Sequence, residues 1–377
     1  MNNPDYAAKD VVVPGLGGRG RTACGGSAGN SNCPVGRCIV LFPPDSGTAL
    51  VHQISDVTIV IRRLCGRASL SAAFCLSLLA LVGVALRVSV RDSFQPVAWM
   101  YYGLPVPVVV AACAVAGFLF RRLRWLRMAR ALTVAGIGCA AWWCVESWQW
   151  HEPLEVRSAM RAMCWNVARG TFGWQAIASH VRSQDADFVG LIESGPKTAE
   201  MLEFWEKMFP GHDIHQYGGG LTTISRFPVE DFSLVPLSWL GCCASCRVIT
   251  ADGPVRVAVV DIRSNPLVPR EGALKALQDF ADQHSNTPLL VMGDLNTPVD
   301  SHHIRRLRTN MQNVFEMRGR GFDLTWPVPC PVLSIDQMWV NRFLEPASTR
   351  LTWSWTSDHR AVLAELSVVH SRVAAAR

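Results

Sequence analysis

The chain has 377 residues, of which 49% are hydrophobic, and its formal net charge is +6. A mean hydropathy of +0.18 is high for a wholly soluble protein, and the apolar excess lies before residue 150. Much of the positive charge comes from one short arginine run, so the charge gives no reason to assign a nucleic-acid surface. The length allows one domain of ordinary size plus additional segments.

Residues 1–60 are rich in Gly, Pro, Ser and Asn, as in "GLGGRGRTACGGSAGNSN". Such a composition buries too little apolar surface to offset the entropy lost on ordering. We therefore predict a disordered N-terminal segment over 1–60. A mis-set start codon, placed upstream of the true one, is the alternative.

Three uncharged apolar runs follow, and we predict transmembrane helices near 68–88, 97–120 and 130–149. The first two are long enough to cross a bilayer, whereas the third is short and ends in a tryptophan-rich stretch typical of the membrane interface. The alternative for each run is a buried helix of a soluble core. The predicted membrane region spans 61–152.

Arginine placement predicts the orientation of these helices. The segment "RRLRWLRMAR" (121–130) holds five arginines, whereas the loop between the first two runs holds two. The positive-inside rule places the N-terminus and segment 121–130 in the cytoplasm. Three crossings of the cytoplasmic membrane then place the C-terminal half on the extracytoplasmic, periplasmic side, and two crossings would keep it inside.

Residues 153–377 have the pattern of a mixed α/β domain. Amphipathic helices are predicted at 172–184, 198–209 and 269–284. Predicted strands lie at 161–168, 185–194, 218–228, 254–264, 288–296, 333–341 and 360–369. Strands that outnumber helices in this way suit sheets covered by helices.

Polar groups gather at the ends of these strands. They are Asn166, Glu193, Asp294, Asn296, Asp336, Asp358 and His359. Each alone is more often a turn former or a surface residue. Together they indicate a ligand-binding face, because strand ends in an α/β domain line such a face.

These residue types suit the hydrolysis of phosphate esters. Carboxylate and amide oxygens bind Mg²⁺ or Mn²⁺, which bridge to phosphate oxygens. A nearby Asp can orient or deprotonate a water molecule, and a His held by a second carboxylate can donate to developing phosphorane charge.

The order of these motifs resembles the endonuclease/exonuclease/phosphatase superfamily. The motifs are "MCWNVARG", "DFVGLIES", "GGGLTTISRFPV", "VMGDLNTPVDS", "TWP", "SIDQMWV" and "SDHRAV". The superfamily includes deoxyribonuclease I, exonuclease III, sphingomyelinases and inositol polyphosphate phosphatases. The resemblance covers about 158–370 and implies a four-layer α/β/β/α sandwich.

The resemblance also implies a metal site for Mg²⁺ or Mn²⁺. Glu193 corresponds to the principal metal ligand of the family. Asn166 lies on the metal side, and Asp358 corresponds to a metal-side or orienting carboxylate.

The resemblance implies catalytic roles for four further residues. Asp294 corresponds to the residue that activates or positions water, and Asn296 to the amide that orients the phosphate. Asp336 and His359 correspond to the carboxylate–histidine pair.

The chain departs from the family pattern at two places. Ile192 stands where a Gln commonly precedes the metal-binding Glu. Where many members have a second histidine, this chain has Asp261 or Arg263, depending on register. Arg263 can donate to a phosphate oxygen but cannot shuttle a proton near neutral pH.

Other patterns carry less information. Cys243 and Cys246 form a C-x-x-C without a second pair at zinc-ribbon spacing, and a disulfide would need an oxidising compartment; both alternatives stay open. No G-x-S-x-G sequence is present, which argues against a serine hydrolase.

The sequence thus predicts a membrane-anchored, Mg²⁺- or Mn²⁺-dependent hydrolase of phosphoester bonds, of the nuclease or phosphodiesterase/phosphatase type. Its substrate is expected to be nucleic acid, a phospholipid headgroup or a soluble phosphate ester. The N-terminal helices contact the bilayer, and no protein partner is implied. The alternative is a catalytically impaired membrane receptor or scaffold that binds phosphorylated ligands.

Overall fold

The computed structural model describes residues 46–155 and 160–369. The predicted disorder of residues 1–45 lies outside this range. Helix α1 (Ser46–Val88) begins inside the segment 1–60 that the sequence predicts to be disordered.

Four helices occupy the apolar region. After α1 come α2 (Gln95–Gly103), α3 (Val106–Arg122) and α4 (Leu126–Ser147). By length and composition, α4 and the Arg63–Val88 part of α1 can each cross a bilayer, and a third crossing arises if α2 and α3 count as one span. These two helices are bent by 67°, where Pro105 and Pro107 interrupt helical hydrogen bonding.

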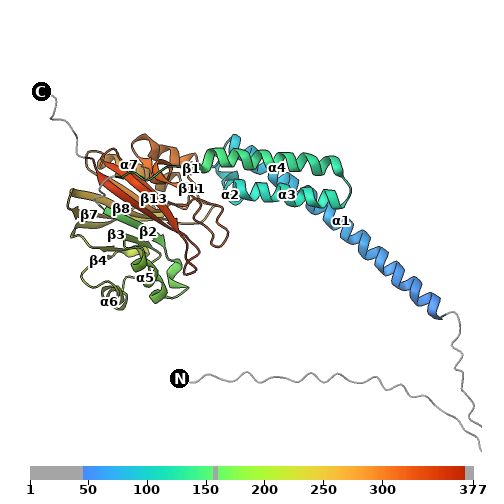
Figure 1. Ribbon diagram of the computed structural model, residues 1–377, viewed down its shortest axis with the longest axis horizontal. Helices are drawn as coiled ribbons and strands as arrows, with labels where there is room; N and C mark the ends of the chain where they lie inside the picture. Colours follow the sequence, from blue (N-terminus) through green and yellow to red (C-terminus); the bar gives the residue numbers. More distant parts are fainter. Residues whose placement is uncertain (1–45, 156–159, 370–377) are drawn as a thin grey trace, which may run out of the picture. The chain divides into compact units, whose positions relative to one another are not determined.

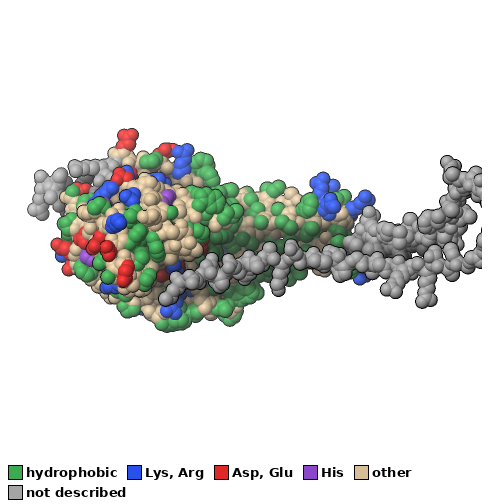
Figure 2. All heavy atoms as spheres, turned by 90° about the horizontal axis from the view of Figure 1, so that it is seen from below, with side chains coloured by type: hydrophobic (Ala, Val, Ile, Leu, Met, Phe, Trp, Pro, Cys, Tyr) green, Lys and Arg blue, Asp and Glu red, His purple; other side chains and the backbone are tan. Residues whose placement is uncertain are grey.

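Small residues let these helices pack closely. Helices α3 and α4 run side by side (Figure 1), and a β-carbon added at Gly136 would lie 3.1 Å from Cβ of Cys113. Ala112, Ala116 and Ala129 are also buried between helices. Close backbone approach through small residues is typical of helices that associate in a membrane, and hydrophobic side chains cover much of the remaining helical surface (Figure 2).

Two six-stranded sheets form the domain that follows. In spatial order the first contains β13 (Leu344–Thr352), β14 (Ala361–Val368), β2 (Met160–Asn166), β3 (Phe188–Ile192), β5 (Thr222–Ser225) and β4 (Asp213–Gln216). The second contains β10 (Gln312–Asn313), β12 (Asp336–Val340), β9 (Leu289–Asp294), β8 (Gly253–Ile262), β7 (Gly241–Thr250) and β6 (Val229–Pro236). A small separate pair joins β1 (Trp148–Trp150) to β11 (Arg320–Phe322).

Helices cover the outer faces of both sheets. Helices α5 (Trp174–Ser183) and α6 (Ala199–Met208) pack on the first sheet, and α7 (Glu271–Gln283) packs on the second beside the 3-10 helix His303–Thr309. Short helical turns lie at Ala168–Gly170, Gly218–Gly220 and Val314–Arg318 (α8). A third apolar cluster fills the space between the sheets. The predicted four-layer α/β/β/α sandwich is confirmed (Figure 1).

The sheets approach each other closely at Gly190 in β3. A β-carbon there would lie 2.7 Å from side-chain atoms of both Val259 and Met292, which belong to the opposite sheet. Only a glycine permits this contact, because real Cβ atoms do not come this near to other heavy atoms. The close contact brings β3 and β9 together just before two acidic residues, Glu193, which follows β3, and Asp294, which ends β9.

The two cysteines of the C-x-x-C motif lie on opposite faces of β7. Cys243 packs under α7, whereas Cys246 packs between the sheets. Residues three apart on a strand point to opposite sides, so these two thiols neither share a zinc ion nor form a disulfide, and both are free.

Candidate active site

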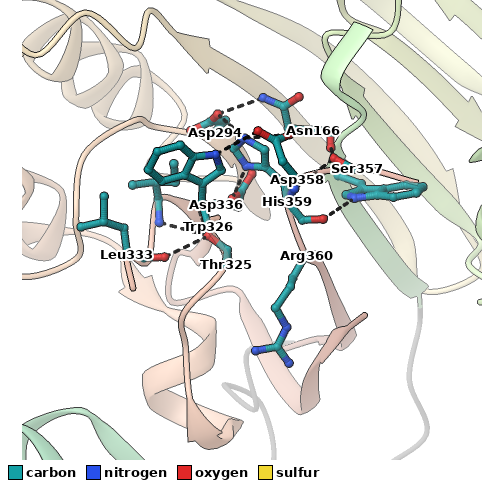
Figure 3. A network of polar contacts seen from close by, with 12 residues as sticks. Asn166, Asp294, Thr325, Trp326, Leu333, Asp336, Ser357, Asp358, His359 and Arg360 are labelled. Carbon is teal, nitrogen blue, oxygen red and sulfur yellow. Dashed lines mark hydrogen bonds and ion pairs between the residues drawn. The ribbon is translucent and has the colours of Figure 1, made fainter. Parts of the chain in front are cut away.

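Strand ends from both sheets meet at one edge of the sandwich. Asn166 is the last residue of β2, and Asp294 is the last residue of β9. Asn166 Nδ2 donates a hydrogen bond of 3.0 Å to Asp294 Oδ2, which joins the two sheets (Figure 3). Gly293 permits this ending, since a side chain there would collide with the carbonyl oxygen of Val260 on the neighbouring strand.

Asp294, Asp336 and His359 form a buried group, here called the inner network (Figure 3). One ligand atom from each lies within 4.8 Å of the others. The imidazole Nδ1 of His359 lies 2.8 Å from Asp336 Oδ2, and its Nε2 lies 4.0 Å from Asp294 Oδ2. Antiparallel pairing sets this arrangement, because Asp336 at the start of β12 is the register partner of Asp294.

Burial and mutual charge govern protonation in the inner network. Burial raises the pKa of Asp294 well above its usual value, and the neighbouring charge of Asp336 raises it further. Burial alone lowers the pKa of His359, but the charges of Asp336, Asp294 and Asp358 outweigh burial and raise it to about 10. The neighbouring carboxylates therefore favour the protonated imidazole, which can donate a hydrogen bond.

Backbone contacts hold His359 in place. The hydroxyl of Ser357 donates to the carbonyl of Asn166 at 2.7 Å and accepts from the His359 amide at 3.0 Å. The indole Nε1 of Trp165 donates to the His359 carbonyl at 3.0 Å. The loop before β14 is thereby fixed to the end of β2, so the imidazole has little freedom to turn away.

Glu193 and Asp358 lie at the more open side of the site and are here called the outer carboxylates. The Glu193 side chain is 30% exposed, and its Oε2 lies 3.1 Å from Nε of Arg169. The Asp358 side chain is 44% exposed, and its Oδ2 accepts from Trp326 Nε1 at 3.1 Å. Glu193 has φ of +53°, a strained conformation for a non-glycine residue that is found preferentially at functional sites.

The remaining predicted residues lie nearby, with one exception. The amide Nδ2 of Asn296 donates to the Ile262 carbonyl at 2.7 Å, which leaves its second N–H for another acceptor. Arg263 does not join the site: it is exposed and lies outside the cavity lining. Strand β8 ends at Ile262, and its register pairs Asp261, not Arg263, with Asp294.

Asp261 is a carboxylate that the sequence left ambiguous. Burial raises its pKa to about 6, with a further contribution from the charge of Glu193. In addition, Asp336 Oδ1 is buried without a hydrogen-bond partner among the residues described. An acidic cluster whose carboxyl groups resist ionisation fits a divalent cation, which would neutralise them.

The site opens into a cavity of about 640 Å³, within the usual range for ligand pockets. Arg270, at the start of α7, lines it and was not predicted as a site residue. Its side chain is buried, Nε donates to the Asn296 carbonyl at 3.3 Å, and Nη1 has no partner in the described part of the chain. A buried guanidinium with a free N–H is suited to an anionic ligand.

Solved structures of similar fold were found. A Bacteroides thetaiotaomicron endonuclease/exonuclease/phosphatase family protein is 18% identical (TM-score 0.46), with 55% of this chain and 97% of that chain covered. A mannosyl-6-phosphatase of Bacteroides thetaiotaomicron VPI-5482 is 17% identical (TM-score 0.45; 55% and 99% covered). D. rerio TDP2, complexed with a single-strand DNA product, is 13% identical (TM-score 0.46; 55% and 99% covered). A comparison with curated proteins found no match.

A family model gives the assignment. The model of the Endonuclease/Exonuclease/phosphatase family matches residues 163–359, more than half of the chain. The match runs from the strand that ends at Asn166 to His359 and thus includes the whole inner network. The chain belongs to the Endonuclease/Exonuclease/phosphatase family of phosphoester hydrolases.

Proposed function

We propose that this protein is a membrane-anchored hydrolase of phosphoester bonds that depends on Mg²⁺ or Mn²⁺. The observation that carries the proposal is the inner network, in which a buried Asp294 faces an imidazole held at 2.8 Å by Asp336. A carboxylate that can activate water, next to a histidine that can donate to the phosphoryl group, suits the hydrolysis of a phosphoester. A receptor without catalytic function has no need of this geometry.

Each residue of the inner network has a distinct role in the proposed reaction. Asp294 orients a water molecule and accepts its proton as the water oxygen attacks phosphorus. His359 donates from Nε2 to a phosphoryl oxygen, where negative charge develops, and Asp336 fixes the imidazole from the other side. Asn296 and Arg270 hold the remaining phosphoryl oxygens through their free N–H groups.

The outer carboxylates, together with Asn166 and Asp261, are the residues that would hold the cation. Bound there, Mg²⁺ or Mn²⁺ supplies a positive charge that polarises the phosphoryl group and stabilises the leaving oxygen. Arg169 occupies the same side through its contact with Glu193. A flexible, exposed arginine can leave this carboxylate when a cation or a phosphate arrives.

We further propose that residues 61–152 anchor the domain 153–377 to a cytoplasmic membrane, with catalysis on the extracytoplasmic side. The arginine-rich segment lies between α3 and α4, at the membrane face opposite to the C-terminal ends of α1 and α4. The positive-inside rule places that segment in the cytoplasm, and three crossings then bring the catalytic domain outside.

The test is hydrolysis of the chromogenic diester bis(p-nitrophenyl) phosphate by the full-length protein in detergent. We expect turnover with Mg²⁺ or Mn²⁺ and none with EDTA. Asp294→Ala should reduce kcat by roughly 10³-fold, because the water loses its base. Asp279→Ala is the control, since this exposed residue on α7 pairs with Lys275 and lies outside the cavity lining. Absence of metal-dependent turnover, or equal rates for the two variants, refutes the proposal.

A further inference from the structure

The catalytic cavity is walled in part by the helices that precede the catalytic domain. Trp99, Tyr102 and Gly103 of α2 line the cavity together with Arg270 and His359. These three residues lie more than sixty positions before the first catalytic-domain strand ends at Asn166. The cavity is therefore completed by a segment of the predicted membrane region.

Buried polar contacts fix α2 at this position. Asp92, in the turn before α2, is buried, and its carboxylate accepts from the Tyr102 hydroxyl at 2.8 Å and from the His302 amide at 2.7 Å. It also accepts from the hydroxyl of Ser301. Ser301 lies in the loop that leaves the catalytic Asp294, so one carboxylate joins the helix to the active-site loop.

A second contact reinforces the first. Arg87, near the end of α1, forms an ion pair with Asp300 of the same loop. Arg91 Nη1 donates to the Asp300 carbonyl at 2.6 Å. The Arg87 side chain is buried, and a buried charge without a partner is costly. Loss of Asp300 would therefore destabilise this contact. The loop after β9 is thus held by both the end of α1 and the turn before α2.

Exposed apolar side chains lie on and next to the cavity lining, since Trp99 lines the cavity and Leu267 follows the lining residue Pro266 in the chain. Phe94, Trp99 and Leu267, here called the apolar rim, are each about half exposed or more. Gln95 Nε2 donates to the Leu267 carbonyl at 2.8 Å, which keeps the two halves of the rim together. Exposed aromatic residues beside transmembrane helices favour the boundary between lipid and water.

The dimensions of the helices place the rim at that boundary. Helix α3 has 17 residues, or about 26 Å at 1.5 Å per residue, close to the roughly 30 Å of a bilayer core. In a bilayer crossed by α3, the N-terminal end of this helix would therefore lie near the bilayer surface. Because α2 is bent from α3 by 67°, α2 would then run along that surface instead of continuing through it.

We propose that the substrate is a phosphoester of a membrane lipid, which enters the cavity from the bilayer surface. The inference rests on the proposed hydrolase function and names its substrate class. The headgroup phosphate lies between Arg270 and His359, and the acyl chains remain along the apolar rim. Water adds to phosphorus and gives one proton to Asp294, one P–O ester bond breaks, and the leaving oxygen takes a proton from solvent water.

Charge argues against a nucleic acid as the substrate. Among the described residues that line the cavity, the arginines and lysines are Arg169 and Arg270. DNA binding depends on neutralising many phosphates along a strand, and two cations around one cavity match a single phosphate group. An apolar rim suits the acyl chains of a lipid.

The experiment uses the full-length protein in phosphatidylcholine nanodiscs that contain phosphatidic acid, phosphatidylglycerol, sphingomyelin or a phosphatidylinositol phosphate. The soluble counterparts are glycerol phosphate, glycerophosphoglycerol, glycerophosphocholine and inositol phosphate, with single-stranded and plasmid DNA as further arms. We expect kcat/KM for at least one lipid to exceed that for its soluble counterpart and for DNA by roughly tenfold or more. Preference for DNA or for a soluble ester overturns the inference.

Two tryptophans of matched exposure provide the variant test. Trp99 is 46% exposed at the rim, and Trp125 is 45% exposed at the turn between α3 and α4. Trp99→Ala should lower kcat/KM for the lipid about tenfold, and Trp125→Ala should leave it unchanged. Leu267→Asn, in an exposed loop, probes the same rim if Trp99→Ala fails to fold. Equal lipid rates for the rim variants and Trp125→Ala overturn the inference.

Failure of the inference can be told from failure of the proposed function. If bis(p-nitrophenyl) phosphate is hydrolysed with metal but lipids are not preferred, the hydrolase stands and the lipid substrate is refuted. If no phosphoester is hydrolysed, the proposed function is refuted and the lipid substrate with it.

Discussion

The inner network and the outer carboxylates are built in opposite ways. Asp294, Asp336 and His359 are buried and fixed by hydrogen bonds from two sheets and two loops. Glu193 and Asp358 are partly exposed: Glu193 pairs with an arginine, and Asp358 accepts from an indole and lies 4.0 Å from His359 Nε2. The inner network is therefore organised before a ligand binds, whereas the side chains of the outer carboxylates can still move when a ligand binds.

The physical reason lies in the cost of burial. Burial of a carboxylate without partners costs free energy. The inner network is stable because its members form hydrogen bonds and ion pairs with one another and with Asn166. The outer carboxylates remain hydrated and need no such compensation until a cation displaces their water. We therefore expect variants of the inner network to impair catalysis and variants of the outer carboxylates to impair cation binding.

The largest difference is expected for Asp336→Asn in the inner network. The amide cannot balance the imidazolium charge, so kcat should fall by roughly 10²-fold or more, while the Mg²⁺ concentration needed for half-maximal rate stays the same. Steady-state kinetics with the chromogenic diester measures both values. A higher Mg²⁺ requirement with a normal kcat would instead show that Asp336 acts in cation binding and not in catalysis.

A smaller and different effect is expected for Glu193→Gln among the outer carboxylates. Loss of one charged ligand should raise the Mg²⁺ or Mn²⁺ concentration for half-maximal rate by roughly 10–100-fold, with much of kcat recovered at saturating metal. A metal titration of the purified variant tests this. If saturating metal does not restore kcat, Glu193 acts in the chemical step, and the division between inner network and outer carboxylates is wrong.

The smallest effects are expected for two exposed arginines. Arg169→Ala should change kcat/KM only a few-fold, because a solvent-exposed ion pair contributes about 0–1 kcal/mol. Arg263→Ala should have no effect, since Arg263 lies outside the cavity lining. Paired kinetic assays compare the two. A large loss of kcat/KM for Arg263→Ala would show that Arg263 acts in the site after all.

The sequence predicted the fold and much of the site because both depend on local pattern. Strands such as 288–296 are continuous apolar runs that stop at a polar residue, and their ends mark the site. Strands β6, β7 and β13 were not predicted. The edge strand β6 is exposed along most of its length, and β13 is interrupted by a bulge after Pro346, so neither has an apolar run or a regular alternation.

The missed site residues share a different cause. Arg270 precedes α7 in a loop of ordinary composition, and only tertiary contact buries its guanidinium. Asp261 could not be separated from Arg263 because the choice depends on register between β8 and β9. Likewise, nothing local in "DSFQPVAWMYYG" indicates that Trp99 would border a cavity whose other walls come from residues 166–359.

The hydrogen bonds that Asp92 accepts from Tyr102, Ser301 and His302 affect how the protein should be prepared. Removal of the helices would remove the α2 residues that line the cavity. It would also leave Ser301, His302 and Asp300 without the groups they contact. A truncated soluble fragment would then report on an open, altered pocket. Helix α2 is thus part of the cavity itself, and purification of the full-length protein in detergent or lipid is the preparation that keeps this wall in place.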